Sequence, residues 1–203
     1  EFLYSNNIPS LYRVHEKPEA NKIQYITRIV KNLGILKQEL TPSDFHEFLE
    51  IIKGTPYEEI VNYLILRSLK QARYSYENVG HFGLASECYT HFTSPIRRYP
   101  DLVVHRILKD FLQKGKITKE KEKELEEILP DIAIHSSRME RRADEIERDA
   151  IQIMRVWFMK DKVGEEFAGK VTMVTSEGLR VRLEEYYIEG FLHLSHMTDD
   201  FYQ

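Results

Sequence analysis

The sequence predicts an α+β protein, with a mainly helical first part and a short β segment after it. Through most of residues 1–162, apolar side chains recur at spacings of three and four, which is the period of an amphipathic helix. From Gly164 onward the period becomes two, as in a strand with one buried face. The composition fits one substantial hydrophobic core, because 42% of the 203 residues are hydrophobic.

Three helices are expected in the first third of the chain. The first covers residues 22–33, and Gly34 is a typical stop. The Thr-Pro-Ser-Asp run at 41–44 starts the second, which Gly54 closes, and Thr55-Pro56 starts the third. The predicted apolar faces are Ile23, Ile26, Ile29, Val30 and Leu33 in the first helix, Phe45, Phe48, Leu49 and Ile52 in the second, and Ile60, Leu64 and Ser68 in the third.

Residues 81–102 concentrate hydroxyls, histidines and a pair of arginines between two prolines. Pro95 and Pro100 fix the backbone angle φ, so the residues between them are expected to form a short constrained loop. Pro100 also suits the first turn of a helix, and apolar residues continue at helical spacing from Leu102 to Leu112. Arg97 and Arg98 would then lie at a helix N-terminus, which favours an anion, and guanidinium groups suit phosphate. The stretch therefore indicates a phosphate-binding loop.

Local chemistry leaves a second interpretation of this loop open. The arginine pair could instead form ion pairs with Asp101 or a nearby glutamate, while the hydroxyls cap helices. In the same way, Ser94 could donate to a phosphate or cap the backbone, and Tyr99 could stack on a base or pack in the core. The loop histidines show no spacing typical of a metal site, so structural roles are expected for them: His81, His91 and His105.

The charged run at 114–127 has few apolar positions and should be a solvated loop and helix face. A long helix is expected after this run. Its apolar positions repeat at four-three-four-three-four and predict a narrow buried seam. Glu147 lies roughly 80° from the centre of that seam, from where it could reach a cleft or pair with a cation such as Arg148. The seam residues are Met139, Ala143, Ile146, Ala150, Ile153 and Trp157.

The segment after Gly164 predicts a β-hairpin. Residues 167–173 and 179–183 each alternate apolar with polar positions, and the turn Ser176-Glu177-Gly178 separates them. Arg180 and Arg182 alternate to the face opposite the apolar residues, where they could contact phosphates or remain solvated.

Charge and cysteine content restrict the class of protein. The net charge of −4 means that any nucleic-acid-binding surface must be a local positive patch. Cys88 is the only cysteine, which excludes an internal disulfide and a four-thiolate zinc site and fits a reducing compartment. The sequence has neither an apolar run long enough for a membrane span nor a secretory leader pattern. We therefore expect a cytoplasmic protein with no membrane partner.

Four runs of residues, in order along the chain, resemble the ribonuclease II and ribonuclease R exoribonuclease family and cover nearly its whole length. They are Tyr12 to Pro18, Leu64 to Ala72, the loop segment from His81 to Leu102, and Arg141 to Glu145. The resemblance implies processive 3′ to 5′ hydrolysis of single-stranded RNA, with metal-activated water releasing nucleoside 5′-monophosphates.

Residues 163–203 are similar to the opening strands of the OB-fold domain repeated in the largest protein of the small ribosomal subunit. The expected division is a helical part of a catalytic domain at 1–162 and an incomplete OB-fold RNA-binding domain at 163–203. Because the chain starts without methionine and stops within that domain, we expect a fragment of a larger enzyme, whose remaining parts would be its partners.

The resemblance also implies roles for individual residues. Arg97 is expected to hold the scissile phosphate, and Glu147 occupies the place of a family glutamate near the reactive phosphate. RNA or phosphate contacts are expected from Arg98, Ser94, Tyr99, Arg180, Arg182 and His193. In ribonuclease R relatives, the aspartates that bind magnesium lie upstream of the residues present here. We therefore expect the magnesium ligands outside this chain and no activity from the chain alone.

Two other classes of function remain open. One is a non-catalytic RNA-binding module, and the other is a helical assembly or regulatory domain. Salt dependence distinguishes them, because an RNA binder with several phosphate contacts loses affinity steeply as salt rises. The adjacent Asp199-Asp200 pair lies near the end of the sequence and is not a magnesium site by itself.

Overall fold

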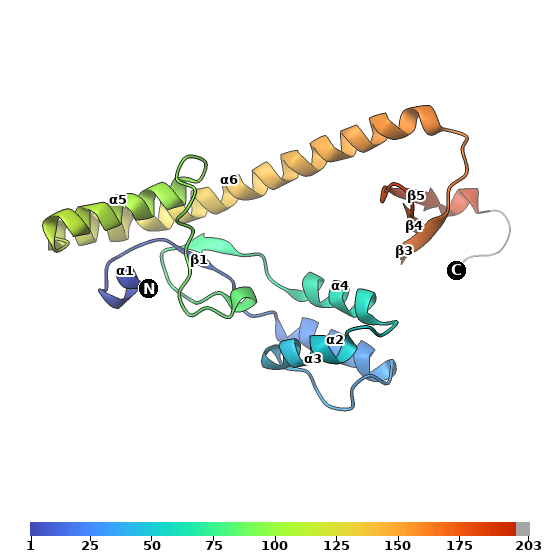
Figure 1. Ribbon diagram of the computed structural model, residues 1–203, viewed down its shortest axis with the longest axis horizontal. Helices are drawn as coiled ribbons and strands as arrows, with labels where there is room; N and C mark the ends of the chain where they lie inside the picture. The colour runs from blue at the N-terminus through green and yellow to red at the C-terminus, as the bar shows by residue number, and fades with distance from the viewer. Residues whose placement is uncertain (198–203) are drawn as a thin grey trace. The chain divides into compact units, whose positions relative to one another are not determined.

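The computed structural model describes residues 1–197, and its contacts divide the chain into two units, Glu1–Arg141 and Arg142–Gln203. Helices dominate the first unit, and the second contains the end of a long helix and a small antiparallel sheet (Figure 1). The predicted α+β class is confirmed. The Asp199-Asp200 pair lies outside the described residues.

The first unit contains the three helices that the sequence predicts near its start. The second of them begins with a capping box, in which the N–H of Thr41 donates to Asp44 Oδ2 at 2.8 Å. The elements up to residue 75 are α1 (Phe2–Ser5), β1 (Tyr12–Val14), α2 (Ala20–Asn32), the 3₁₀ helix η1 (Pro42–Asp44), α3 (Phe45–Ile52), α4 (Glu58–Ser68) and β2 (Arg73–Ser75).

The predicted apolar face of α4 is partly wrong. Ile60 is 54% exposed, whereas Val61, Ile65 and Ser68 are buried, and Leu64 is partly buried. Both stripes of the helix are apolar, so periodicity alone does not choose between them. The choice depends on how α4 packs against α2 and α3, and that packing turns the Val61 stripe inward.

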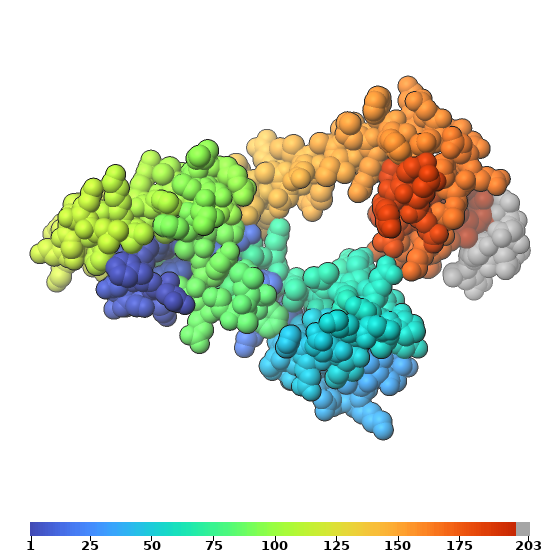
Figure 2. Space-filling model, in the orientation of Figure 1, coloured from blue at the N-terminus to red at the C-terminus, as the bar shows by residue number. Residues whose placement is uncertain are grey.

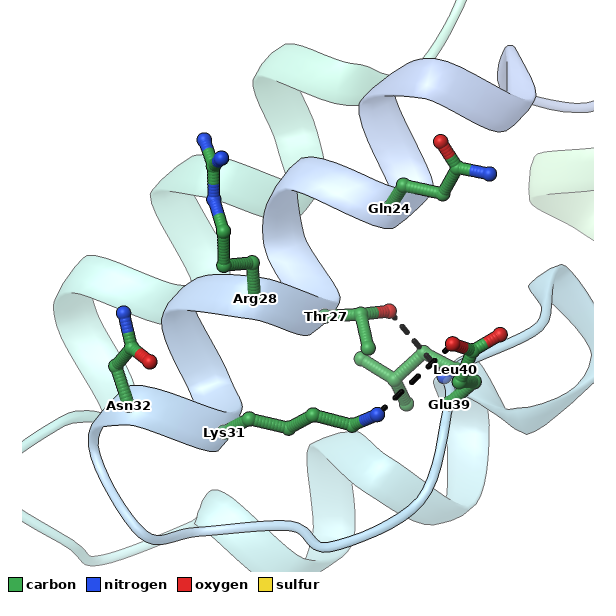
Figure 3. A pocket seen from close by; sticks show the side chains of 7 residues that line it. All are labelled: Gln24, Thr27, Arg28, Lys31, Asn32, Glu39 and Leu40. Carbon is green, nitrogen blue, oxygen red and sulfur yellow. Dashed lines mark hydrogen bonds and ion pairs between the residues drawn. The ribbon is translucent and has the colours of Figure 1, made fainter.

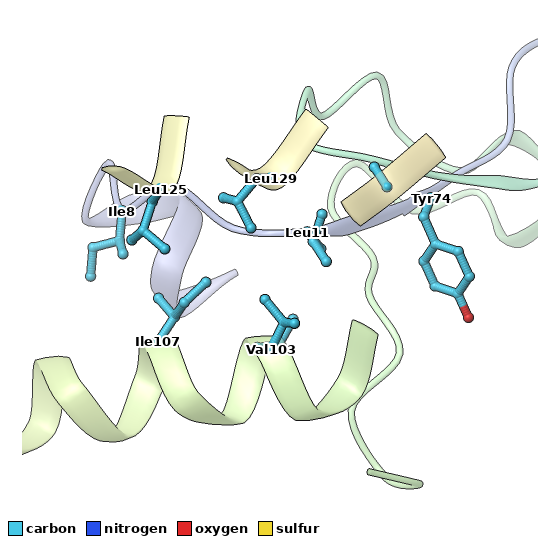
Figure 4. Close-up of a cluster of buried hydrophobic side chains, with 9 residues drawn as sticks. Ile8, Leu11, Tyr74, Val103, Ile107, Leu125 and Leu129 are labelled. Atoms are coloured by element: carbon cyan, nitrogen blue, oxygen red, sulfur yellow. The ribbon is translucent and has the colours of Figure 1, made fainter. Parts of the chain in front are cut away.

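Two hydrophobic clusters stabilise the first unit. One joins α2, α3 and α4 around Phe48, which is 1% exposed. The other joins the chain before β1 to the next two helices, α5 (Tyr99–Lys114) and α6 (Lys119–Met159). In this second cluster Leu11 lies between Val103 of α5 and Leu129 of α6 (Figure 4). The cluster therefore fixes α5, and with it the residues that precede α5.

The strand β1 is paired along both of its edges. On one edge it is antiparallel to β2, with Arg13 opposite Tyr74. On the other edge it binds the segment 80–90, where Arg13 N–H donates to the Tyr89 carbonyl at 2.8 Å and Phe82 N–H donates to the His15 carbonyl at 2.8 Å. These hydrogen bonds hold the segment 80–90, which contains the 3₁₀ helix η2 (Phe82–Leu84), beside β1. The chain then continues to the start of α5.

The predicted long helix is confirmed, but its predicted buried seam is wrong. In α6 the buried residues are Leu125, Leu129, Ala133, Ser136 and Ser137. Further along, the seam residues Ile146, Ile153 and Trp157 are 60%, 68% and 69% exposed. Their periodicity shows an apolar stripe, but no described residue buries it, because the first-unit core ends near Ser137.

The second unit contains the predicted hairpin and a third strand. After the 3₁₀ helix η3 (Lys160–Lys162), the strands β3 (Gly169–Thr175), β4 (Gly178–Leu183) and β5 (Glu189–His193) pair antiparallel in that order, followed by the 3₁₀ helix η4 (Leu194–His196). Gly178 has φ of +153°, and a Cβ there would lie 2.1 Å from the Leu192 carbonyl oxygen, so the turn requires glycine. The described residues form this open sheet and no closed barrel.

No helix within residues 1–197 combines the length and the apolar character needed to span a bilayer.

Candidate functional site

The residues before α5 form a tight turn closed on Ser94. The Ser94 carbonyl accepts the backbone N–H groups of Arg97 at 3.2 Å and Arg98 at 3.0 Å. The carboxylate of Asp101, in the first turn of α5, reaches back and accepts the backbone N–H of Ser94 at 2.8 Å. The predicted constrained loop is thus a turn fixed at both ends. In the space-filling view the green segment that contains it reaches the molecular surface (Figure 2).

The two arginines of this turn have different surroundings. Arg98 donates from Nη2 to Asp101 Oδ2 at 2.9 Å, and its side chain is only 21% exposed. Arg97 is exposed and has no ion pair or hydrogen bond from its side chain to any described residue. The ion-pair interpretation therefore holds for Arg98, whereas Arg97 keeps its guanidinium available to an anion.

The other residues predicted in this turn also have defined positions. Ser94 is half-buried, and Tyr99, the first residue of α5, is 50% exposed, so Tyr99 does not belong to the core. Arg98 is the N-cap of α5, a helix of 16 residues that begins at Tyr99, so Arg97 lies two residues before the helix. Backbone N–H groups and the positive end of the helix dipole favour negative charge at such a position.

The histidines near the turn have structural partners. His91 Nδ1 lies 2.8 Å from Tyr74 Oη, and His105 Nε2 lies 2.7 Å from the Phe92 carbonyl oxygen. Burial lowers the pKa of His91 below its usual value of 6.5, and the nearby cations Arg98 and Arg13 lower it further. Both histidines are therefore engaged in contacts that support the residues around the turn.

Sequence reasoning missed the support behind the turn. Arg13 of β1 forms an ion pair of 2.5 Å with Glu140 of α6, and its guanidinium lies 4.8 Å from the centre of the Tyr74 ring. Tyr74 in turn contacts His91. Three elements distant in sequence meet here, and only tertiary contacts, which no local pattern records, bring them together.

In the second unit, strand register places three of the predicted residues on one face of the sheet. Arg180 lies opposite Phe191, and Arg182 and His193 share this face by the two-residue period. Arg180 is 3.7 Å from Glu189, and His193 Nδ1 is 2.9 Å from Ser195 Oγ. Basic and aromatic side chains are thus neighbours on one face of this sheet.

Glu147 is exposed on α6 in the second unit, whereas Arg97 belongs to the first. The structure therefore does not bring these two predicted residues together within one unit.

A pocket of about 220 Å³ lies beside α2 and contains none of the predicted site residues (Figure 3). Its polar groups hold the loop after α2, since Thr27 Oγ1 accepts the N–H of Leu40 at 3.2 Å and Lys31 Nζ lies 4.0 Å from Glu39. Within residues 1–197, no group of three or more His, Cys, Asp or Glu side chains is arranged to hold a metal ion. The described residues thus do not fit a magnesium site of their own.

Comparison with known families defines the class of protein. The sequence pattern of the RNB domain matches residues 1–114, and that of the S1 RNA binding domain matches residues 160–203. The chain therefore combines an RNB segment with an S1 segment. It belongs to the RNB family, which confirms the resemblance found in its sequence.

The curated relatives at this similarity are named ribonuclease R. That of Aquifex aeolicus is 45% identical over 197 residues, which is 96% of this chain and 28% of the relative. That of Escherichia coli is 40% identical over 205 residues, covering 96% of this chain and 25% of the relative. The chain thus spans about a quarter of the length of these relatives.

Solved structures show the same fold. RNase R of Mycoplasma genitalium, in complex with ribose methylated single-stranded RNA, matches with a TM-score of 0.87 and 33% identity, over 98% of this chain and 32% of that one. Yeast Ssd1, a pseudonuclease, matches with a TM-score of 0.68 and 24% identity over 94% of this chain and 24% of that one. The fold alone therefore does not distinguish a nuclease from a pseudonuclease.

Proposed function

We propose that this chain is the phosphate-gripping and RNA-channel part of a cytoplasmic 3′ to 5′ exoribonuclease that releases nucleoside 5′-monophosphates from single-stranded RNA. The observation that carries the proposal is Arg97, whose exposed guanidinium has no partner among the described residues and lies two residues before α5, in a turn fixed by its neighbours. Membership of the RNB family supports this role.

In this proposal Arg97 contacts the scissile phosphate and stabilises the negative charge that grows in the transition state. A guanidinium fork can donate two parallel hydrogen bonds to phosphate oxygens, and fixed donors cost little reorganisation during the reaction. Arg98, already bound to Asp101, contacts a neighbouring phosphate or braces the turn. Ser94 and Tyr99 line the same turn and contact the RNA backbone or a base.

The remaining assignments concern the second unit. Arg180, Arg182 and His193 share one sheet face, which we assign to single-stranded RNA leaving or entering the site. Glu147 acts near the reactive phosphate once the remaining parts of the enzyme are present. We take residues 1–162 as the catalytic-domain part and 163–203 as the start of the RNA-binding domain.

Magnesium, in this proposal, is held by residues outside this chain. The described residues provide no suitable ligand cluster for it. What this chain supplies is the grip on phosphates.

The test uses the intact enzyme that contains this chain. Single-stranded RNA labelled at either end is incubated with the enzyme and magnesium, with a matched reaction containing a chelator as control. We expect the 3′ label to leave as mononucleotide while the 5′-labelled strand shortens progressively. RNA that is bound and protected without shortening would instead show a non-catalytic binding module, and internal cuts would show a different nuclease mechanism.

A further inference from the structure

Asp101 is the most completely buried charged side chain near the turn, with an exposed fraction of 0%. One of its oxygens, Oδ2, accepts both the backbone N–H of Ser94 at 2.8 Å and Nη2 of Arg98 at 2.9 Å. Its other oxygen and Arg98 Nε are buried without a partner among the described residues. A carboxylate in this position is costly to bury, so apolar packing does not account for it.

The contacts of Asp101 lie at the two ends of the turn that carries Arg97. Ser94 begins the turn and Arg98 ends it, and both are tied to the same carboxylate oxygen. Arg97 lies between these two fixed points, and its side chain has no partner within residues 1–197. The two arginines therefore differ in function. Asp101 neutralises the charge of Arg98, whereas the guanidinium of Arg97 is exposed.

We infer that Asp101 is a positioning residue, whose carboxylate holds the turn and neutralises Arg98 so that Arg97 meets the phosphate at full charge and in fixed geometry. This inference rests on the proposed function. Asp101 itself does not touch RNA. Its removal leaves an uncompensated cation beside the bound strand and loosens the turn.

The uncompensated charge of Arg98 should change RNA affinity, whereas the loosened turn should change the cleavage rate constant. In the Asp101→Asn variant the site gains positive charge, so single-stranded RNA should bind about 2- to 5-fold more tightly at low salt. The cleavage rate constant should fall on the order of tenfold, because small misplacement of a catalytic group is costly. A merely structural role would not raise affinity while lowering turnover.

The experiment measures single-turnover cleavage and equilibrium RNA binding on the intact enzyme. The variants are Asp101→Asn, Arg98→Gln and the double variant that carries both changes. The matched control is Asp110→Asn, since Asp110 lies on the same helix and pairs with Lys114 at 2.6 Å, outside the turn. We expect the control to match the parent, and the double variant to return RNA affinity to within about twofold of the parent, because both charges are removed together.

Several outcomes would overturn the inference. One such outcome is that Asp101→Asn leaves RNA affinity and cleavage rate unchanged, and another is that it lowers both equally. A third is that its effects on affinity and rate simply add to those of Arg98→Gln in the double variant. If Asp101→Asn alone does not fold, the double variant decides, because a neutral Asn and Gln pair leaves no buried charge unpaired. Cleavage by the double variant that falls no further than in Arg98→Gln supports positioning through Arg98, and a further tenfold loss contradicts it. If the parent cleaves no RNA, the proposed function fails, and the affinity changes still judge Asp101.

Discussion

Two adjacent residues of identical chemistry, Arg97 and Arg98, have opposite environments. From the residues alone, either could pair with Asp101, because side chains three and four positions apart lie on the same side of a helix start. The structure gives the ion pair to Arg98, which is the N-cap of α5, and leaves Arg97 in the turn before it. Sequence reasoning could predict the loop and its charge, but not which arginine the carboxylate would neutralise.

Replacement of Arg97 by Lys tests the catalytic assignment. Lysine keeps the charge but loses the planar fork, so kcat of the intact enzyme should fall by roughly 10² while RNA affinity changes less than about threefold. Arg106→Lys is the matched control, since Arg106 is exposed on α5 away from the turn. Single-turnover cleavage and equilibrium binding on one short RNA at fixed salt separate the two effects. A rate within about threefold of the parent would show that Arg97 only positions RNA.

His91 gives the turn a pH-dependent support. Its pKa is lowered by burial, then by Arg98 and Arg13, so the folded chain keeps it neutral to a lower pH than the unfolded chain does. Its contribution to stability is therefore present above pH 6.5 and is lost as pH falls through its lowered pKa in the folded state. In His91→Asn, the free energy of unfolding should fall less between pH 7.5 and 5, measured by urea denaturation.

The control for His91→Asn is His46→Asn, because His46 is exposed on α3. That change should leave the pH dependence of the parent intact. A parent-like slope in His91→Asn would mean that His91 is not held neutral by its surroundings.

At the scale of elements, periodicity predicts that a helix exists better than it predicts which side is buried. The end of α2 follows from Gly34, and the start and end of α3 follow from the capping box at Thr41 and from Gly54, which are local signals. The buried side of α4 is different, because both the Ile60 and the Val61 stripes are apolar and tertiary packing decides between them.

Substitution of two neighbouring isoleucines at the end of α3 tests how α3 packs against α2 and α4. Ile52 is fully buried in the cluster of α2, α3 and α4, whereas Ile51 is 50% exposed. Ile52→Ala should lower the free energy of unfolding by about 2 to 5 kcal/mol, through lost burial and a residual cavity. Ile51→Ala should cost less than about 1 kcal/mol. Equal losses in urea denaturation would show that α3 is turned differently.

The ion pairs of Glu16, which follows β1, with Lys70 and Arg73 should be sensitive to acid. Glu16 accepts from Lys70 Nζ at 2.7 Å and Arg73 Nη2 at 2.9 Å, and these hydrogen bonds lower its pKa from 4.5 to about 2. The stabilisation is therefore complete above pH 4.5 and is lost as pH falls toward 2. Glu16→Gln should reduce stability at pH 7 by up to about 1 kcal/mol per exposed pair, and the difference from the parent should shrink on acidification.

The control for Glu16→Gln is Glu50→Gln, which removes one exposed pair with Lys53 on and after α3. We expect this control to cost less at pH 7. A difference between Glu16→Gln and the parent that grows as pH falls would contradict the assigned sign.

At the scale of the whole molecule, the fold class and the family could be predicted because their signals are local and continuous along the chain. Helix periods, the change of period at Gly164 and the ordered motif runs all lie within short windows. The burial of the stripe around Trp157 could not be predicted, because its period shows an apolar surface and not what covers it. The same limit applies to the support of the turn by Arg13, Tyr74 and Glu140, which depends on three distant elements.

Because the described residues hold no cluster of metal ligands, the chain alone should bind RNA without cutting it. We expect no magnesium-dependent nucleotide release from 3′-labelled RNA, and weak binding of single-stranded RNA whose logarithmic salt slope is about −0.7 per phosphate contact. Arg97→Gln should make that slope shallower by about 0.7, and Arg106→Gln should not change it. Fluorescence anisotropy at several salt concentrations measures the slope, and gel analysis of the same samples measures release. Nucleotide release that persists through repurification of the chain would mean that a complete active site lies within these 203 residues.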